Sequence, residues 1–102
     1  MSVESVWRRF FKAVHGCVTC NKPSLQNRLA CVYEFDIAGI DNEDDGIPAV
    51  IWGRIASLRT AVTSHGSIEA TTRAMTTEEA ARWLHEVVEI FHDLARVHCR
   101  AE

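Results

Sequence analysis

The chain has 102 residues, of which 47% are hydrophobic and 25% are charged. This is the size and composition of a globular domain, so we expect residues 1–102 to form a single domain around one core. The composition excludes a disordered or collagen-like chain. No apolar run reaches the roughly 20 residues that a membrane-spanning helix needs, and the first residues lack the continuous apolar stretch of a signal peptide. We therefore expect a cytoplasmic protein with no membrane partner.

The net charge of -3 is unevenly distributed along the chain. Residues 1–33 carry five lysines and arginines against one glutamate, whereas residues 34–102 carry six against thirteen aspartates and glutamates. Proteins dedicated to nucleic acids derive much of their affinity from lysine and arginine at phosphates, so the net charge argues against nucleic acid as a partner. The basic third nevertheless contains a candidate basic patch, formed by Arg8, Arg9 and Lys12.

Two amphipathic helices are predicted at the ends of the chain. From residue 3 apolar side chains recur every three or four positions, which is the period of a helix with one buried face. They are Val3, Val6, Trp7, Phe10, Phe11 and Val14. Gly16 is the expected C-terminal cap of this helix. A second helix is predicted over 77–98, with Thr76 and Glu79 as a capping box. Its apolar stripe is Ala80, Leu84, Val87, Phe91 and Leu94.

The middle of the chain decides the fold class. A third helix is predicted over 47–64, with a stripe of Ile47, Ile51, Ile55, Leu58 and Val62. Residues 24–38 have two interpretations: a strand, from alternating apolar side chains, or a helix that Ser24 begins and Gly39 ends in the left-handed conformation. The helical interpretation gives a mainly α fold, a small four-helix bundle with loops at 16–23, 39–46 and 66–75. The alternative is an α+β fold, with N- and C-terminal helices and a small antiparallel sheet.

Four side chains near residue 20 form a candidate metal site. Cys17 and Cys20 are separated by two residues, a spacing at which two thiolates bind one zinc ion from a single turn. His15 and Cys31 are the nearest candidates for the remaining ligands. The pattern is incomplete, because the sequence has no second C-x-x-C pair to supply the other two ligands. We expect no cofactor, and keep a structural zinc ion or a thiol-based function as the alternative.

A second candidate site lies in the segment 39–46. Asp41, Glu43, Asp44 and Asp45 are predicted to form an acidic loop that meets a basic surface of a partner protein. The loop differs from a calcium-binding loop, because Trp52 occupies the twelfth position, where a glutamate ligand belongs. Trp52 is instead a candidate partner contact, since it projects away from the apolar stripe of its helix.

No motif in the sequence identifies a reaction. Nucleophile elbows and glycine-rich phosphate loops are both missing, so we do not expect an enzyme. The leading hypothesis is a small helical protein-binding module, an acidic adaptor, regulator or inhibitor that acts through a helical surface and the acidic loop, and that forms a homodimer. An inhibitor or host-interaction protein from a mobile element is compatible with this hypothesis. The alternative is a zinc-binding or thiol-based regulatory module that uses Cys17 and Cys20.

Overall fold

The computed structural model describes residues 3–19, 21, 24–40 and 47–101. These residues form five α-helices and one π-helical turn. The elements are α1 (Val3–Thr19), α2 (Leu25–Val32), η1 (Tyr33–Ile37), α3 (Ala49–Thr63), α4 (Ile68–Ala74) and α5 (Thr77–Ala101). None of the described residues lies in a strand. The predicted mainly α fold is confirmed, and the α+β alternative is wrong, because the segment 24–38, which it needs as a strand, forms α2 and η1.

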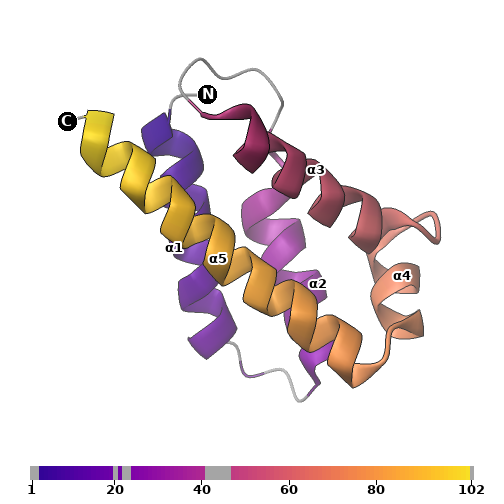
Figure 1. Cartoon of the computed structure of the whole chain (residues 1–102). Helices are drawn as coiled ribbons and strands as arrows, with labels where there is room; N and C mark the ends of the chain where they lie inside the picture. The colour runs from indigo at the N-terminus through magenta and orange to yellow at the C-terminus, as the bar shows by residue number, and fades with distance from the viewer. Residues whose placement is uncertain (1–2, 20, 22–23, 41–46, 102) are drawn as a thin grey trace.

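The 25-residue α5 is the longest helix and organises the molecule. It packs against α1, α2 and α3, and Figure 1 shows it running diagonally across α1 and α2 with α3 alongside. Its buried side chains are Ala80, Val87, Ile90 and Leu94. Two members of the predicted stripe, Leu84 and Phe91, are only half-buried. The buried face of α5 is therefore rotated toward Ile90 relative to the prediction.

One cluster of buried apolar side chains joins α1, α2, η1, α3 and α5. All five members of the stripe that was predicted for 47–64 are buried in it. The buried face of α1 is narrower than predicted: it contains Val6, Phe10 and Ala13, while the side chain of Phe11 is 51% exposed. The exposed side chains of α1 include Arg8, Phe11 and Lys12.

Side-chain caps define where three helices begin. The hydroxyl of Ser24 accepts from the amide of Asn27 at the start of α2, at 3.1 Å. The hydroxyl of Ser67 does the same for α4. The predicted capping box of α5 is confirmed: Glu79 N–H donates to the Thr76 hydroxyl at 3.1 Å, and Thr76 N–H donates to the Glu79 carboxylate at 3.3 Å. Such caps satisfy amides that have no partner within the helix.

Three details of the prediction are wrong. Gly16 does not end the first helix, because α1 continues to Thr19. The predicted loop 66–75 contains α4, a short helix with too few apolar residues to show a periodic stripe. Gly39 is not in the left-handed conformation: among the described residues only Gly66 has a positive φ, of 91°.

Candidate binding groove

A concave surface lies between α1 and η1. It is an open groove of about 430 Å³, lined on α1 by Ser5, Arg8, Arg9 and Lys12 and on η1 by Phe35 and Asp36. The three cations are the basic patch that the sequence predicted. We call this surface the basic groove. It brings together three positive charges, one carboxylate and an aromatic ring that is 77% exposed.

The spacing of the cations on α1 explains their common orientation. Val6, Phe10 and Ala13 occupy the buried face, and side chains two positions further along the chain point away from the core. Arg8 and Lys12 are four residues apart and therefore neighbours on the helix surface. Arg8 also contacts Glu4 at 2.8 Å, but both side chains are more than half exposed, so this ion pair is weak.

The π-helical turn determines which side chains of the second helix face α1. Leu29, Val32 and Tyr33 are buried, and in a continuous α-helix the next member of this stripe is Asp36, four positions after Val32. In η1 the Ala38 amide instead donates to the Tyr33 carbonyl, at 2.8 Å, which adds one residue to the turn. Ile37 consequently takes the buried position, and Asp36 lies at the edge of the core, in the basic groove.

The carboxylate of Asp36 has two opposing influences. Partial burial raises its pKa above 3.8, while the positive charges of Lys12 and Arg9 act to lower it. Burial is the larger effect, so the neighbouring cations only partly compensate for the loss of water. A Cβ added at Gly16 would lie 3.9 Å from a carboxylate oxygen of Asp36 and 3.4 Å from Val32. Both distances are ordinary van der Waals contacts, so η1 packs directly against α1 at this point.

Two arginines from other helices lie at the C-terminal end of η1. A Cβ on Gly39 would lie 2.8 Å from a guanidinium nitrogen of Arg9, so this flexible group would have to shift to make room for a side chain there. The guanidinium of Arg59, on α3, donates to the carbonyl of Ile40. Carbonyls at the end of a helix have no partner within it and carry partial negative charge, so cations are favourable there. Arg9 thus borders both the groove and the end of the π-helical turn.

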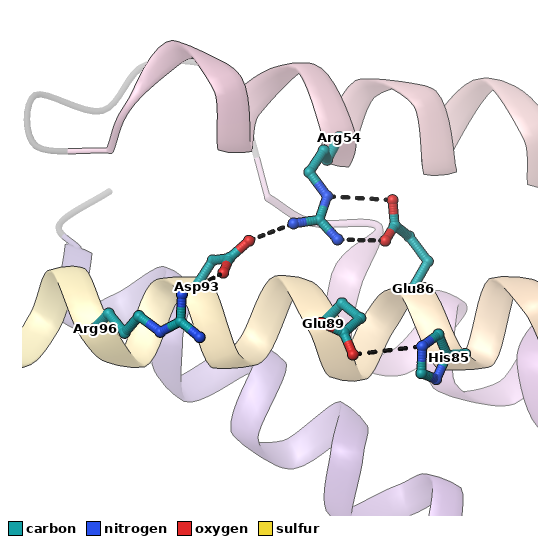
Figure 2. A network of polar contacts seen from close by, with 6 residues as sticks. All are labelled: Arg54, His85, Glu86, Glu89, Asp93 and Arg96. Atoms are coloured by element: carbon teal, nitrogen blue, oxygen red, sulfur yellow. Dashed lines mark hydrogen bonds and ion pairs between the residues drawn. The ribbon is translucent and has the colours of Figure 1, made fainter.

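A different polar cluster connects α3 and α5 (Figure 2). The guanidinium of Arg54 donates to both carboxylate oxygens of Glu86, at 2.5 and 3.3 Å, and also to Asp93. The bond to Glu86 is the main cause that raises the pKa of Arg54. Arg96 adds a further contact to Asp93, at 3.6 Å. Because each carboxylate faces a guanidinium, we interpret this cluster as a structural connection between helices.

An aromatic cluster joins α1 to α5 on the other side of α1. Trp7 stacks on His98, with the ring centroids 4.9 Å apart, and also contacts Phe11 and Phe91. The indole Nε1 of Trp7 is buried, and no hydrogen-bond partner is found for it among the described residues. Phe11 is half exposed, so this cluster extends the apolar surface of α1.

The other predicted site residues are not brought together. Asp41, Glu43, Asp44, Asp45 and Cys20 lie outside the described residues. Cys17 and Cys31 are half-buried, and His15 is exposed. Within the described part of the chain, no group of three histidine, cysteine, aspartate or glutamate side chains is arranged to hold a metal ion. Trp52 is half-buried against the core. The zinc site, the acidic loop and the homodimer all stay predictions.

The sequence prediction missed three groove residues: Ser5, Phe35 and Asp36. One signal for them was present. Asp36 is the only charged residue at a position of the apolar stripe in the segment 24–38, and a carboxylate at a core position indicates that the helical register changes there.

Comparison with known proteins adds no identity, since no family model, curated protein or solved structure matches the chain. Among the described residues no helix combines the length and the apolar composition required to span a bilayer. The function must therefore be argued from the groove itself.

Proposed function

We propose that this chain is a small, non-enzymatic protein-binding module that holds an acidic segment of another protein in the basic groove. The observation that carries the proposal is the composition of the groove, in which three cations and an exposed aromatic ring face one carboxylate. Acidic side chains of a partner complement Arg8, Arg9 and Lys12, and an apolar side chain of the same segment covers Phe35. An adaptor, a regulator or an inhibitor acts through such a surface.

The overall charge favours a short acidic segment over a long polyanion. The chain has a net charge of -3, and residues 34–102 contain thirteen of its fourteen acidic residues. A nucleic acid that extended beyond the groove would meet this negative charge, which weakens binding at physiological salt. A peptide segment that ends within the groove avoids the repulsion. Phe35, the exposed aromatic residue of the groove, also favours a ligand with apolar side chains, because such a ligand covers its ring.

Selection from a random peptide display library tests the class of partner. We expect the chain to enrich sequences with two or more acidic residues next to an aromatic or aliphatic one. Enrichment of basic or purely apolar peptides contradicts the proposal. So does preferential binding of a single-stranded oligonucleotide over the selected peptide at 150 mM salt.

Charge reversal in the groove provides the matched control. Replacing Arg8 and Lys12 by glutamate is expected to weaken binding of the selected peptide at least about tenfold, because both side chains then repel its carboxylates. Reversing Arg73 and Arg82, exposed residues that lie outside the groove, changes the net charge by the same amount. This second variant is expected to bind within about twofold of the unmodified chain. Equal losses in the two variants indicate a general charge effect and contradict a groove site.

A further inference from the structure

The π-helical turn interrupts the regular α-helix and thereby places Phe35 and Asp36 in the groove beside α1. Its extra residue keeps Ile37 buried and places Asp36 and Phe35 on the groove, where a continuous α-helix would direct Asp36 into the core. Unusual helical turns of this kind occur preferentially at functional sites. The position of Asp36 is therefore a property of the turn and not of the regular helix before it.

Asp36 is placed where the acidic group of a ligand belongs. Its carboxylate shares the groove with Lys12 and Arg9, the two cations that act on it electrostatically, and it lies 3.9 Å from the position of a Cβ on Gly16 of α1. Arg8 lines the same groove. The groove thus carries three positive charges and one negative charge of its own before a ligand enters.

We propose that Asp36 determines the ligand specificity of the basic groove, as an internal counter-ion that an acidic group of the partner displaces from Lys12 and Arg9. This inference rests on the proposed function and specifies how the groove selects among acidic segments. A ligand with one carboxylate merely exchanges one negative charge for another and gains little. A ligand with two or more carboxylates and an apolar side chain over Phe35 gains contacts that Asp36 does not provide.

Neutralising Asp36 without changing its shape gives the first test. The probe is a fluorescein-labelled heptapeptide in which three glutamates flank a central tryptophan on each side. Its binding is measured by fluorescence anisotropy at 50 and 150 mM salt. Asp36→Asn is expected to tighten probe binding about fivefold at the lower salt, because the competing carboxylate is gone. The improvement is expected to be larger for a peptide with a single glutamate, since that ligand is the one that Asp36 excludes.

Glu34→Gln is the matched control. Glu34 lies on the same turn, is exposed and does not line the groove, so its neutralisation changes the net charge equally. We expect less than about a twofold change in probe affinity for this variant. Equal effects of the two substitutions overturn the proposal, because net charge then accounts for both. Weaker binding by Asp36→Asn also overturns it, since Asp36 would then position the cations instead of competing for them.

Carbon-13 NMR of the side-chain carboxyls detects the displacement directly in the unmodified chain. Saturating probe is expected to move the titration of Asp36 to higher pH, because the carboxylate loses its cations and gains a negative neighbour. An unchanged titration of Asp36 in the saturated complex overturns the displacement.

The two proposals fail in different ways. If the unmodified chain and Asp36→Asn bind the probe equally well, and Arg8→Glu with Lys12→Glu abolishes binding, the groove binds acidic ligands but Asp36 does not control them. If neither the unmodified chain nor Asp36→Asn binds the probe or any display-selected peptide, the proposed function fails, and this inference fails with it.

Discussion

The helix α3 and the composite helix α2–η1 bury similar apolar stripes but reach them by different backbones. In α3 the buried positions follow the α-helical period from residue 51 to residue 62 without interruption. In α2–η1 the same period meets Asp36, and a π-helical turn moves Ile37 into its place. The comparison shows that a regular helix optimises the core alone, whereas the interrupted one also exposes Phe35 and Asp36 to solvent.

The two regions also differ in how completely their positive charges are neutralised by carboxylates within the protein. Arg54, on α3, faces two carboxylates of α5. In the basic groove Arg9 and Lys12 act on a single carboxylate, Asp36, and Arg8 has only a weak, exposed pair with Glu4 of its own helix. Charges that neutralise one another within a protein add little to recognition, while an excess of one sign attracts a partner of the opposite sign. Register and charge thus indicate the same functional surface.

Single-residue deletions give the largest expected contrast between the two helices. Deleting Ser57, an exposed residue of α3, rotates Leu58 and Val62 out of the core and is expected to cost about 4 kcal/mol or more of unfolding free energy. Deleting Glu34 converts η1 into an α-helical turn in which Ile37 stays buried, four positions after Val32. We expect a cost below about 2 kcal/mol.

Urea unfolding followed by circular dichroism measures both deletions. The Glu34 deletion is expected to keep the helical spectrum but to lose peptide binding, because Phe35 and Asp36 change their positions around the helix. Similar destabilisation by the two deletions would contradict the idea that the π-helical turn is an insertion into an otherwise regular helix.

The ion-pair cluster between α3 and α5 predicts a smaller effect. Arg54→Met keeps the aliphatic packing but leaves Glu86 without its guanidinium partner and Asp93 with only the longer contact to Arg96. Because the three side chains are only 27–31% exposed, we expect a loss of about 1 to 2 kcal/mol in thermal or urea unfolding. Arg73→Met is the control: it removes the ion pair with Glu69, in which both side chains are more than three-quarters exposed, and is expected to cost less than about 0.5 kcal/mol. A cost for Arg54→Met as small as the control's contradicts a structural role.

Two glycines separate helix propensity from close packing. Gly53 lies in α3 with nothing within 4 Å of an added Cβ, so Gly53→Ala is expected to stabilise the chain by about 0.5 to 1 kcal/mol. Gly39→Ala places a Cβ against the guanidinium of Arg9, a flexible group that moves at little cost. We expect little change in stability but altered peptide affinity, measured by urea unfolding and anisotropy. A change in peptide affinity for Gly53→Ala but not for Gly39→Ala would contradict a role of Arg9 in the groove.

Much of the fold was predictable because periodic apolar spacing reports directly on burial. The stripe of α3 and the capping box of α5 were predicted residue by residue and are confirmed. The short α4 was missed, because its buried side chains are threonines whose hydroxyls bond to the preceding turn, and a polar helix has no apolar period. Gly16 and Gly39 were misinterpreted as caps, since spacing alone does not reveal which neighbour approaches a glycine.

The candidate site was half predictable. The cations of α1 belong to one helix, so their common face follows from local spacing. Phe35 and Asp36 join them only through tertiary packing and a change of helix type, neither of which a fixed period of 3.6 residues anticipates.

The smallest expected effect concerns the pH dependence of stability and isolates Asp36. Partial burial raises the pKa of its carboxyl in the folded chain above 3.8, so the folded state binds a proton more readily than the unfolded state. The contribution of Asp36 to stability is therefore present at low pH and is lost as the pH rises from about 3.8 through the raised value. Asparagine cannot ionise, so Asp36→Asn does not lose this stability as the pH rises.

The stability of Asp36→Asn relative to the unmodified chain is therefore expected to increase over that pH interval and then to level off, with a total change within about 0.5 kcal/mol. Urea unfolding at a series of pH values measures the difference, in which the titrations of the other carboxylates cancel. A relative stability of Asp36→Asn that falls with increasing pH means that Lys12 and Arg9 stabilise the ionised carboxylate more than burial destabilises it. A partner's carboxylate would then have to replace a favourable interaction of Asp36 with Lys12 and Arg9. That result contradicts the proposed displacement, which requires the charge of Asp36 to be only partly compensated by these cations.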